Sequence, residues 1–169
     1  TLPELEAQVR AWGEERGMRV GTFQTNSEAA FLEHVHGLAG AVDGAIVNPG
    51  AWTHYQYSIR DALEVMGTPF VEVHLSDVDA REDFRRISVV RDIAVAQVRV
   101  SQSAFEDAPV SVQADVTAAG FRGRQLSAQL IDQAGAVAQE QTIDARADGE
   151  TAAVRFQLKP TQPWLSFYQ

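Results

Sequence analysis

Three short stretches of the sequence carry polar and charged side chains suited to acid–base chemistry and anion binding. They span residues 48–54, 72–76 and 81–85. A histidine such as His74 can donate a proton near neutral pH, and a nearby carboxylate such as Glu72 can fix its tautomer. Arg85 adds a permanent positive charge with a planar fork of donors. These residue types favour a site that binds a small anion and transfers a proton.

Each of these residues also has a purely structural interpretation. A lone histidine at the end of a strand more often belongs to ordinary structure than to a catalytic site. The run Asn48-Pro49-Gly50 is by itself typical of a turn. His34 and His36 fall within a predicted helix, where we interpret them as surface or packing residues. Spacing alone therefore supports only a cleft that suits a small anion.

Alternating helical and strand patterns over residues 1–92 predict the elements that position these stretches. Helices are expected near residues 2–16, 27–38, 57–66 and 79–86, and strands near 18–24, 44–48 and 70–74. Short apolar strands between helices are typical of a parallel sheet. Ligands of such sheets sit outside the carboxyl ends of the strands, so Asn48 and His74 should face one cleft. The amides of Leu75 and Ser76, on the following turn, can bind a carboxylate there.

From about residue 93 the pattern changes to strand-like alternation of apolar and polar residues. Strands are expected near residues 110–116, 126–131, 136–143, 152–158 and 164–168, with no helix of comparable strength. The inward-facing residues should be Val110, Val112, Leu126, Leu130, Val154 and Phe156. The segment 93–100 suits either the last strand of the first half or the first strand of the second. We expect two domains, 1–92 and 93–169, the second a small antiparallel sandwich.

Composition narrows the class of protein. The 169 residues have a formal net charge of -9, which opposes nonspecific binding to nucleic acid. There is no cysteine, so a disulfide framework and a thiolate zinc site are excluded. No apolar run approaches the roughly 18 residues of a membrane span, and no secretory leader is recognised. We therefore expect a cytoplasmic protein that acts on a small anionic substrate.

Three motifs, in order, resemble those of type II 3-dehydroquinate dehydratases. They are FQTNSE at 23–28, NPGAWTH at 48–54 with IRDAL at 59–63, and EVHLS at 72–76 with AREDFR at 80–85. The resemblance covers residues 1 to about 88. It implies a flavodoxin-like parallel sheet with helices on both faces and assembly into homo-oligomers. It also implies dehydration of 3-dehydroquinate to 3-dehydroshikimate, with no metal and no organic cofactor.

The resemblance assigns roles residue by residue. His74 would be the general acid for the departing hydroxyl, Glu72 would orient it, and Asn48 would hold that hydroxyl. The residues that would bind substrate are Gly50, His54, Leu75, Ser76 and Arg85, with Asp61 reaching into a neighbouring subunit's site. We expect Asn48, His54, His74, Ser76 and Arg85 to line a single cleft.

The sequence also departs from the family's pattern. We find no counterpart of the family's first strand and lid loop, which carry the tyrosine base. That strand would lie between the strands near 18–24 and 44–48, so another segment must fill its place or the sheet must rearrange. Tyr55 and Tyr57 replace small residues, and Asp77 and Asp79 replace Asn and His.

Two functions remain open. The first is a 3-dehydroquinate dehydratase-like enzyme whose turnover is impaired. The second is a noncatalytic chimera or designed scaffold, in which the β half is an interaction or structural module. Residues from about 93 weakly resemble immunoglobulin-like modules of bacterial surface or membrane proteins, which fits either function.

Overall fold

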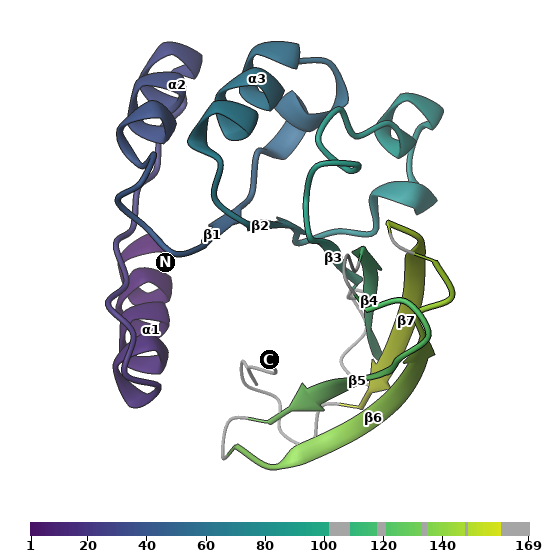
Figure 1. The fold of residues 1–169 in the computed structure, drawn as a ribbon. Helices are drawn as coiled ribbons and strands as arrows, with labels where there is room; N and C mark the ends of the chain where they lie inside the picture. Colours follow the sequence, from purple (N-terminus) through teal and green to yellow (C-terminus); the bar gives the residue numbers. More distant parts are fainter. Residues whose placement is uncertain (102–108, 118–120, 133–134, 148, 160–169) are drawn as a thin grey trace.

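The computed structural model describes residues 1–101, 109–117, 121–132, 135–147 and 149–159 (Figure 1). Its α-helices are α1 (Leu2–Glu15), α2 (Glu28–Gly37) and α3 (Tyr57–Met66), close to the predicted ranges. Local capping explains where α1 and α2 begin. Glu4 accepts a hydrogen bond from the Thr1 amino group at 2.6 Å, and the Ser27 hydroxyl accepts one from the amide of Ala30. The helix expected near 79–86 is instead two 3-10 turns, η2 (Val78–Ala80) and η3 (Asp83–Arg86).

Helix α3 ends at Gly67, whose backbone is left-handed with φ of 65°. A side chain there would strain the backbone by about 1–2 kcal/mol. We therefore expect Gly67→Ala to lower the free energy of unfolding by about that amount, measured by urea denaturation. Gly37→Ala in α2, which has ordinary helical backbone and open space around it, is the matched control and should be neutral or slightly stabilising. A Gly67→Ala protein as stable as the parent would contradict this reasoning.

The central sheet has five strands in the order β1-β2-β3-β4-β7. They are β1 (Ala45–Val47), β2 (Phe70–His74), β3 (Ala96–Ser101), β4 (Val110–Thr117) and β7 (Thr151–Leu158). The first three are parallel, whereas β4 and β7 run antiparallel to their neighbours. Strands β5 (Gln125–Ile131) and β6 (Val137–Asp144) form a second, two-stranded antiparallel sheet. The strand expected near 164–168 lies outside the described residues.

Strand β3 belongs to both halves of the chain. It pairs in parallel with β2 from Val71↔Ala96 to His74↔Arg99, and antiparallel with β4 from Ala96↔Val116 onward. The segment that suited either half therefore serves both. One sheet runs across the expected boundary at residues 92 and 93, and the division into two domains stays a prediction.

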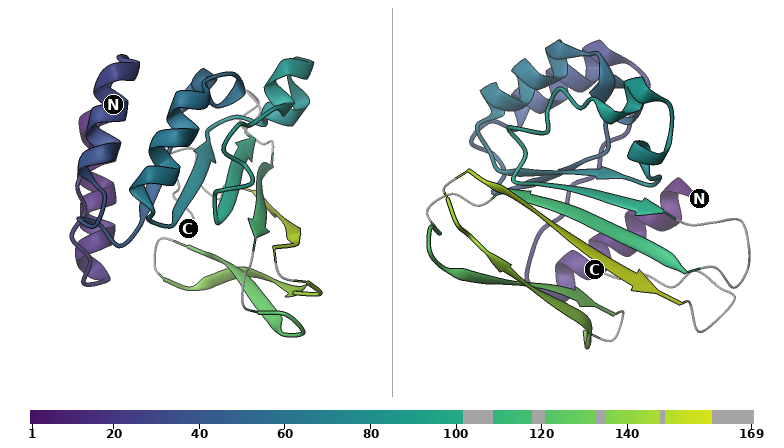
Figure 2. Two further views of the ribbon diagram at one scale, coloured as in Figure 1. Left: turned by 45° about the horizontal axis from the view of Figure 1, so that its top comes forward. Right: turned by 90° about the vertical axis from the view of Figure 1, so that its right-hand side faces the viewer.

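The chain is a mixed α/β protein, but its helices do not cover both faces of the sheet as expected. Helices α2 and α3 lie on one face, while β5 and β6 lie across the opposite face of β4 and β7 (Figures 1 and 2). Helix α1 lies beyond β1, and its Leu2 and Leu5 are 47% and 44% exposed. The core under α2 and α3 contains Val35, Ile59, Leu63, Met66, Phe70 and Val90.

The strand predicted at 18–24 does not form. This segment runs extended beside α1 (Figure 1), and residues 19–25 make no backbone–backbone hydrogen bond within the described part of the chain. Side chains hold it instead, since Thr22 accepts a hydrogen bond from Arg10 and Phe23 stacks on His34 at 3.9 Å between ring centroids. A strand requires a hydrogen-bonded neighbour, which apolar periodicity alone does not supply.

The antiparallel β half matches the alternation in the sequence. Leu130, Val154 and Phe156 are 3–4% exposed, and Val112 and Leu126 pack against them between the two sheets. Val110 is only half-buried and lies outside this cluster. Side chains of β6 also satisfy the outer edge of β7, since Gln139 donates to the Gln157 carbonyl at 2.6 Å. No helix occurs in the described residues of this half.

Candidate functional site

Glu72 and His74 form a buried pair at the carboxyl end of β2. Residues two apart in a strand share a face, and theirs is the face of Phe70, which packs beneath the helices. The exposed fractions of Glu72 and His74 are 0% and 5%. His74 Nε2 lies 2.8 Å from Glu72 Oε1. The carboxylate can only accept, so Nε2 carries the proton and Nδ1 is the nitrogen that can meet a ligand.

Four donors surround the Glu72 carboxylate. Besides His74, they are the Thr53 hydroxyl, the Ser88 hydroxyl at 2.9 Å and the Gln97 amide nitrogen at 2.6 Å. Burial alone would raise the pKa of Glu72, but the hydrogen bonds from His74, Thr53 and Ser88 together hold this pKa below its ordinary value. Glu72 therefore enters the site as a carboxylate.

His54 places a second imidazole beside His74. It ends the 3-10 turn η1 (Gly50–His54), and its Nδ1–H donates to the Ile87 carbonyl at 2.6 Å. The two imidazole centroids are 6.4 Å apart with an angle of 15° between the planes. The edge-on ring of Phe84 lies 5.9 Å from His54 on its other side. This packing fixes the orientation of His54.

Arg85 lies next to this cluster. Its guanidinium carbon is 4.9 Å from the centroid of the Phe84 ring, and its Nε donates to Glu82 at 2.8 Å. The interaction with Arg85 also contributes to the lowered pKa of Glu82, after the larger effect of a backbone hydrogen bond. Arg85 thus places its positive charge against the Phe84 ring, which in turn packs on His54, although one of its donors is already engaged.

Asn48, Leu75 and Ser76 follow strands β1 and β2 at the same edge of the sheet, whereas Asp61 lies on helix α3. Asn48 follows β1, whose last residue Val47 pairs with Glu72, so it lies at the carboxyl edge of the sheet. Its Oδ1 accepts the amide hydrogen of Gly50 at 3.1 Å, which forms the turn expected there. Leu75 is 73% exposed, Ser76 is half-buried, and Asp61 is exposed on α3. A single cleft lined by all of these residues stays a prediction.

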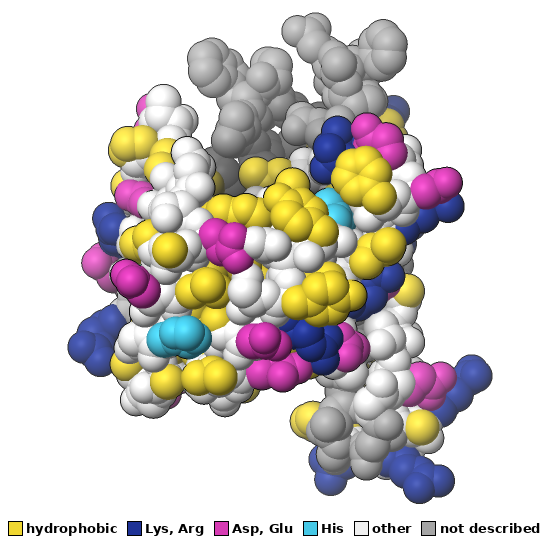
Figure 3. Space-filling view, turned by 90° about the horizontal axis from the view of Figure 1, so that it is seen from above, with side chains coloured by type: hydrophobic (Ala, Val, Ile, Leu, Met, Phe, Trp, Pro, Cys, Tyr) yellow, Lys and Arg dark blue, Asp and Glu magenta, His cyan; other side chains and the backbone are white. Residues whose placement is uncertain are grey.

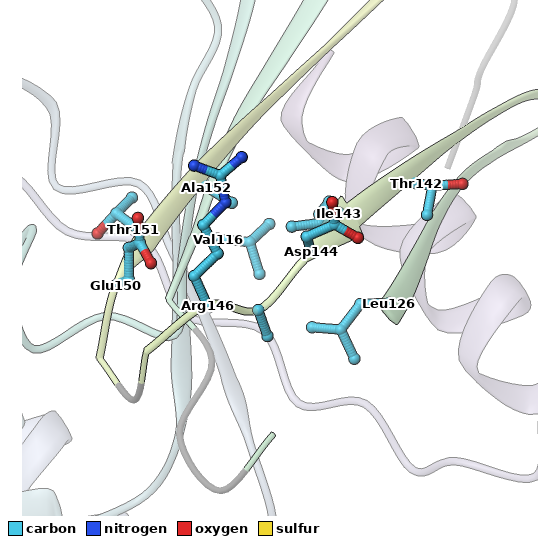
Figure 4. A pocket seen from close by; sticks show the side chains of 10 residues that line it. Val116, Leu126, Thr142, Ile143, Asp144, Arg146, Glu150, Thr151 and Ala152 are labelled. Carbon is cyan, nitrogen blue, oxygen red and sulfur yellow. The ribbon is translucent and has the colours of Figure 1, made fainter. Parts of the chain in front are cut away.

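Apolar side chains gather on the face seen from above, where the helices and 3-10 turns lie (Figure 3). Tyr55, Phe84 and Ile87, which flank the histidines in sequence or in space, are 53–57% exposed. A hollow of about 300 Å³ lies elsewhere, between the two sheets of the β half (Figure 4). Its apolar residues include Leu126 and Ile143, and Arg146 and Glu150 stand at its rim. It is separate from the Glu72–His74 pair.

Sequence reasoning missed the polar residues around Glu72. Thr53 lay within a recognised motif without an assigned role, and Ser88 and Gln97 were not singled out. The signal for Gln97 was present, because Gln97 and Arg99 alternate with Ala96, Val98 and Val100. Polar residues in one phase of a buried strand indicate a polar network on that face.

The described residues contain neither a metal-binding cluster nor a membrane-spanning helix. No three His, Asp or Glu side chains in that part of the chain are grouped so that they can hold a metal ion. None of its helices is long and apolar enough to cross a membrane.

Comparison with known proteins places this chain in a family. The family model described as "Dehydroquinase class II" matches residues 1–106. A 3-dehydroquinate dehydratase of Pelobacter propionicus is 46% identical over 99 residues, which are 58% of this chain and 66% of that protein. One of Thermotoga maritima is 44% identical over 95 residues, or 56% of this chain and 65% of that protein. The matched region thus spans about two thirds of these relatives.

Two solved structures of type II dehydroquinases are also similar to this chain. The type II dehydroquinase of Propionibacterium acnes superimposes with a TM-score of 0.55 at 36% identity, covering 60% of this chain and 73% of that one. The enzyme of Butyrivibrio crossotus gives 0.54 at 35% identity, covering 57% and 68%. Because the family model matches well over half of the residues, this chain belongs to the class II dehydroquinase family.

Proposed function

We propose that the chain acts on 3-dehydroquinate and carries the acid and binding side of a dehydratase site. The observation that carries this proposal is the buried Glu72–His74 pair, with His54 stacked nearby. In the dehydration to 3-dehydroshikimate, a base removes the carbon-bound proton to leave an enolate, and a carbon–carbon double bond forms as the carbon–oxygen bond breaks and the hydroxyl leaves as water. His74 would supply the proton for that water, and the Glu72 carboxylate would stabilise the imidazolium before the transfer. The names of the curated relatives support this substrate.

The binding groups follow from the same proposal. The backbone amides of Leu75 and Ser76, with the charge of Arg85, would bind the substrate carboxylate and hydroxyls. Asn48 would hold the departing hydroxyl, while Gly50 allows the turn that positions it: its φ is 58°, in the region glycine favours. The site would need neither a metal nor an organic cofactor.

A ligand titration tests this proposal without requiring turnover. We expect 3-dehydroquinate to bind the 169-residue protein in isothermal titration calorimetry. Arg85→Ala should weaken binding by about 10-fold or more, because it removes a charge-assisted hydrogen bond. His36→Ala, which removes an exposed histidine on α2, is the control and should leave binding unchanged. Absence of binding, or equal binding by Arg85→Ala, would count against the proposal.

A noncatalytic role is the second candidate. The family match ends at residue 106, whereas the sheet continues without a break into β4 and β7. That continuity supports β4 to β7 being a structural or interaction module, and we propose that it is immunoglobulin-like. A folded protein that binds no 3-dehydroquinate would favour this second candidate.

We propose that the partners are the small anionic substrate and other copies of this chain, with no nucleic acid, and that the protein works in the cytoplasm. The exposed carboxylate of Asp61 on α3 is free of any described ion pair and is available to a neighbouring copy. Light scattering on the purified protein measures the oligomeric state directly.

A further inference from the structure

We propose that Gln97, held by Arg99 and Asp115, is a positioning residue that keeps Glu72 as the hydrogen-bond acceptor for His74. The role of His74 itself rests on the function proposed above. The network does not, since it is defined by contacts among this chain's own residues. It links the Glu72–His74 pair to β4, which lies beyond the stretch that the family model matches.

The sheet register brings these residues together. Glu72 on β2 pairs with Gln97 on β3, and Gln97 pairs with Asp115 on β4. Three side chains in one row across neighbouring strands point to the same face and lie within contact range. His74 pairs with Arg99 in the next row of that face. The row therefore connects the site to β4 over only three strands.

Arg99 donates hydrogen bonds to both Asp115 and Gln97, and Gln97 in turn donates one to Glu72. Arg99 NH2 donates to Asp115 Oδ2 at 2.6 Å, and Arg99 NH1 donates to Gln97 Oε1 at 2.7 Å. Arg91 Nε donates to the same Gln97 oxygen at 3.0 Å. Gln97 Nε2 then donates to Glu72 Oε2 at 2.6 Å.

The chemistry of the donors fixes which end of the Gln97 amide faces each partner. A guanidinium has only donors, so the Gln97 oxygen must face Arg91 and Arg99. The Gln97 NH2 group must then face Glu72, and a donor there requires an acceptor. A protonated Glu72 oxygen would place a second donor against the Gln97 NH2 group. The site is buried, since Gln97 and Arg99 are each 2% exposed, so two facing donors there would be costly. Asp115 supports this arrangement by balancing the buried charge of Arg99.

Among the described residues, the charged and titratable groups that face Glu72 or its network come from several elements. They are His54 of η1, His74 of β2, Arg91 before β3, Arg99 of β3 and Asp115 of β4. Of these, His74 alone touches Glu72 directly, and the two arginines act through Gln97. Gln97 is therefore the connection through which β4 and the arginines influence the carboxylate.

The test is a pH titration of the Glu72 carboxyl carbon by ¹³C NMR in the complete 169-residue protein. In Gln97→Met, which keeps the side-chain length but removes the amide, the midpoint should move upward by about one pH unit, a tenfold change in proton affinity. Asp115→Asn should move it in the same direction by a smaller amount. Gln129→Met, the same change at an exposed position of β5, should leave it unchanged.

The titration of Glu72 and the binding of 3-dehydroquinate can fail independently of each other. A folded Gln97→Met protein whose Glu72 midpoint equals that of the parent would overturn the inference. If Gln97→Met does not fold, Asp115→Asn decides, because an unmoved midpoint there also overturns it. The titration contains no substrate, so a failure to bind or convert 3-dehydroquinate leaves its result intact. Lost binding beside the expected midpoint shift would refute only the proposed function.

Discussion

The polypeptide of residues 1–169 is expected to convert 3-dehydroquinate slowly or not at all, even where it binds. The described cluster supplies an acid, a carboxylate and groups that bind anions. The two tyrosines among the described residues, Tyr55 and Tyr57, are 57% and 67% exposed. No described residue is placed as a base for the carbon-bound proton. A general base contributes about 10²–10⁴-fold, so a site without one should be slower by at least about 10²-fold.

Steady-state absorbance of the conjugated enone of 3-dehydroshikimate measures this turnover. His74→Ala is the companion variant, because residual turnover that depends on His74 shows that the acid is functional. Turnover in the ordinary range of about 1–10³ per second that vanishes in His74→Ala would contradict the expectation. Tyr55→Phe and Tyr57→Phe would then show which tyrosine, if either, acts as the base. Calorimetry on the same samples separates weak binding from slow chemistry.

Local signals in the sequence predicted much of the fold. The ranges of α1 to α3 followed from the helical pattern, and those of β4 to β7 followed from the alternation of apolar and polar residues. The prediction of a strand at 18–24 was wrong for a physical reason. Its apolar pattern suits a strand, but strand formation depends on a neighbour that supplies hydrogen bonds, and no described segment does so. The expectation that helices cover both faces of the sheet failed with it, because α1 lies beyond β1 and not over the sheet.

The site was predictable where its geometry is local. Glu72 and His74 share a face because they are two residues apart in a strand, and Arg85 reaches Glu82 within one turn. The network behind Glu72 was not predictable, because it depends on the register of β2 with β3 and of β3 with β4. A shift of one residue would turn Gln97 to the other face of the sheet.

Replacing Glu72 should destabilise the fold more than replacing any exposed carboxylate. Glu72 is fully buried and accepts hydrogen bonds from Thr53, Ser88 and Gln97 as well as His74. Glu72→Ala leaves these donors buried without an acceptor, which should cost about 3–5 kcal/mol in the free energy of unfolding by urea. Glu64→Ala is the matched control, since Glu64 is exposed and pairs with Arg60 at 2.9 Å. It should cost less than about 1 kcal/mol.

The dependence on pH distinguishes the charge of Glu72 from its bulk. Its pKa in the folded protein lies below the ordinary value of 4.5 that the unfolded chain approaches. The stabilisation from the ionised carboxylate is therefore fully present above about pH 4.5 and is lost as the pH falls through the folded pKa. The difference in unfolding free energy between the parent protein and Glu72→Ala should therefore shrink as the pH falls from about 5 to about 3, where a carboxyl group with a lowered pKa becomes protonated. Glu64→Ala should show no comparable change. A difference that stays constant over this range would mean that Glu72 stabilises the fold by packing alone.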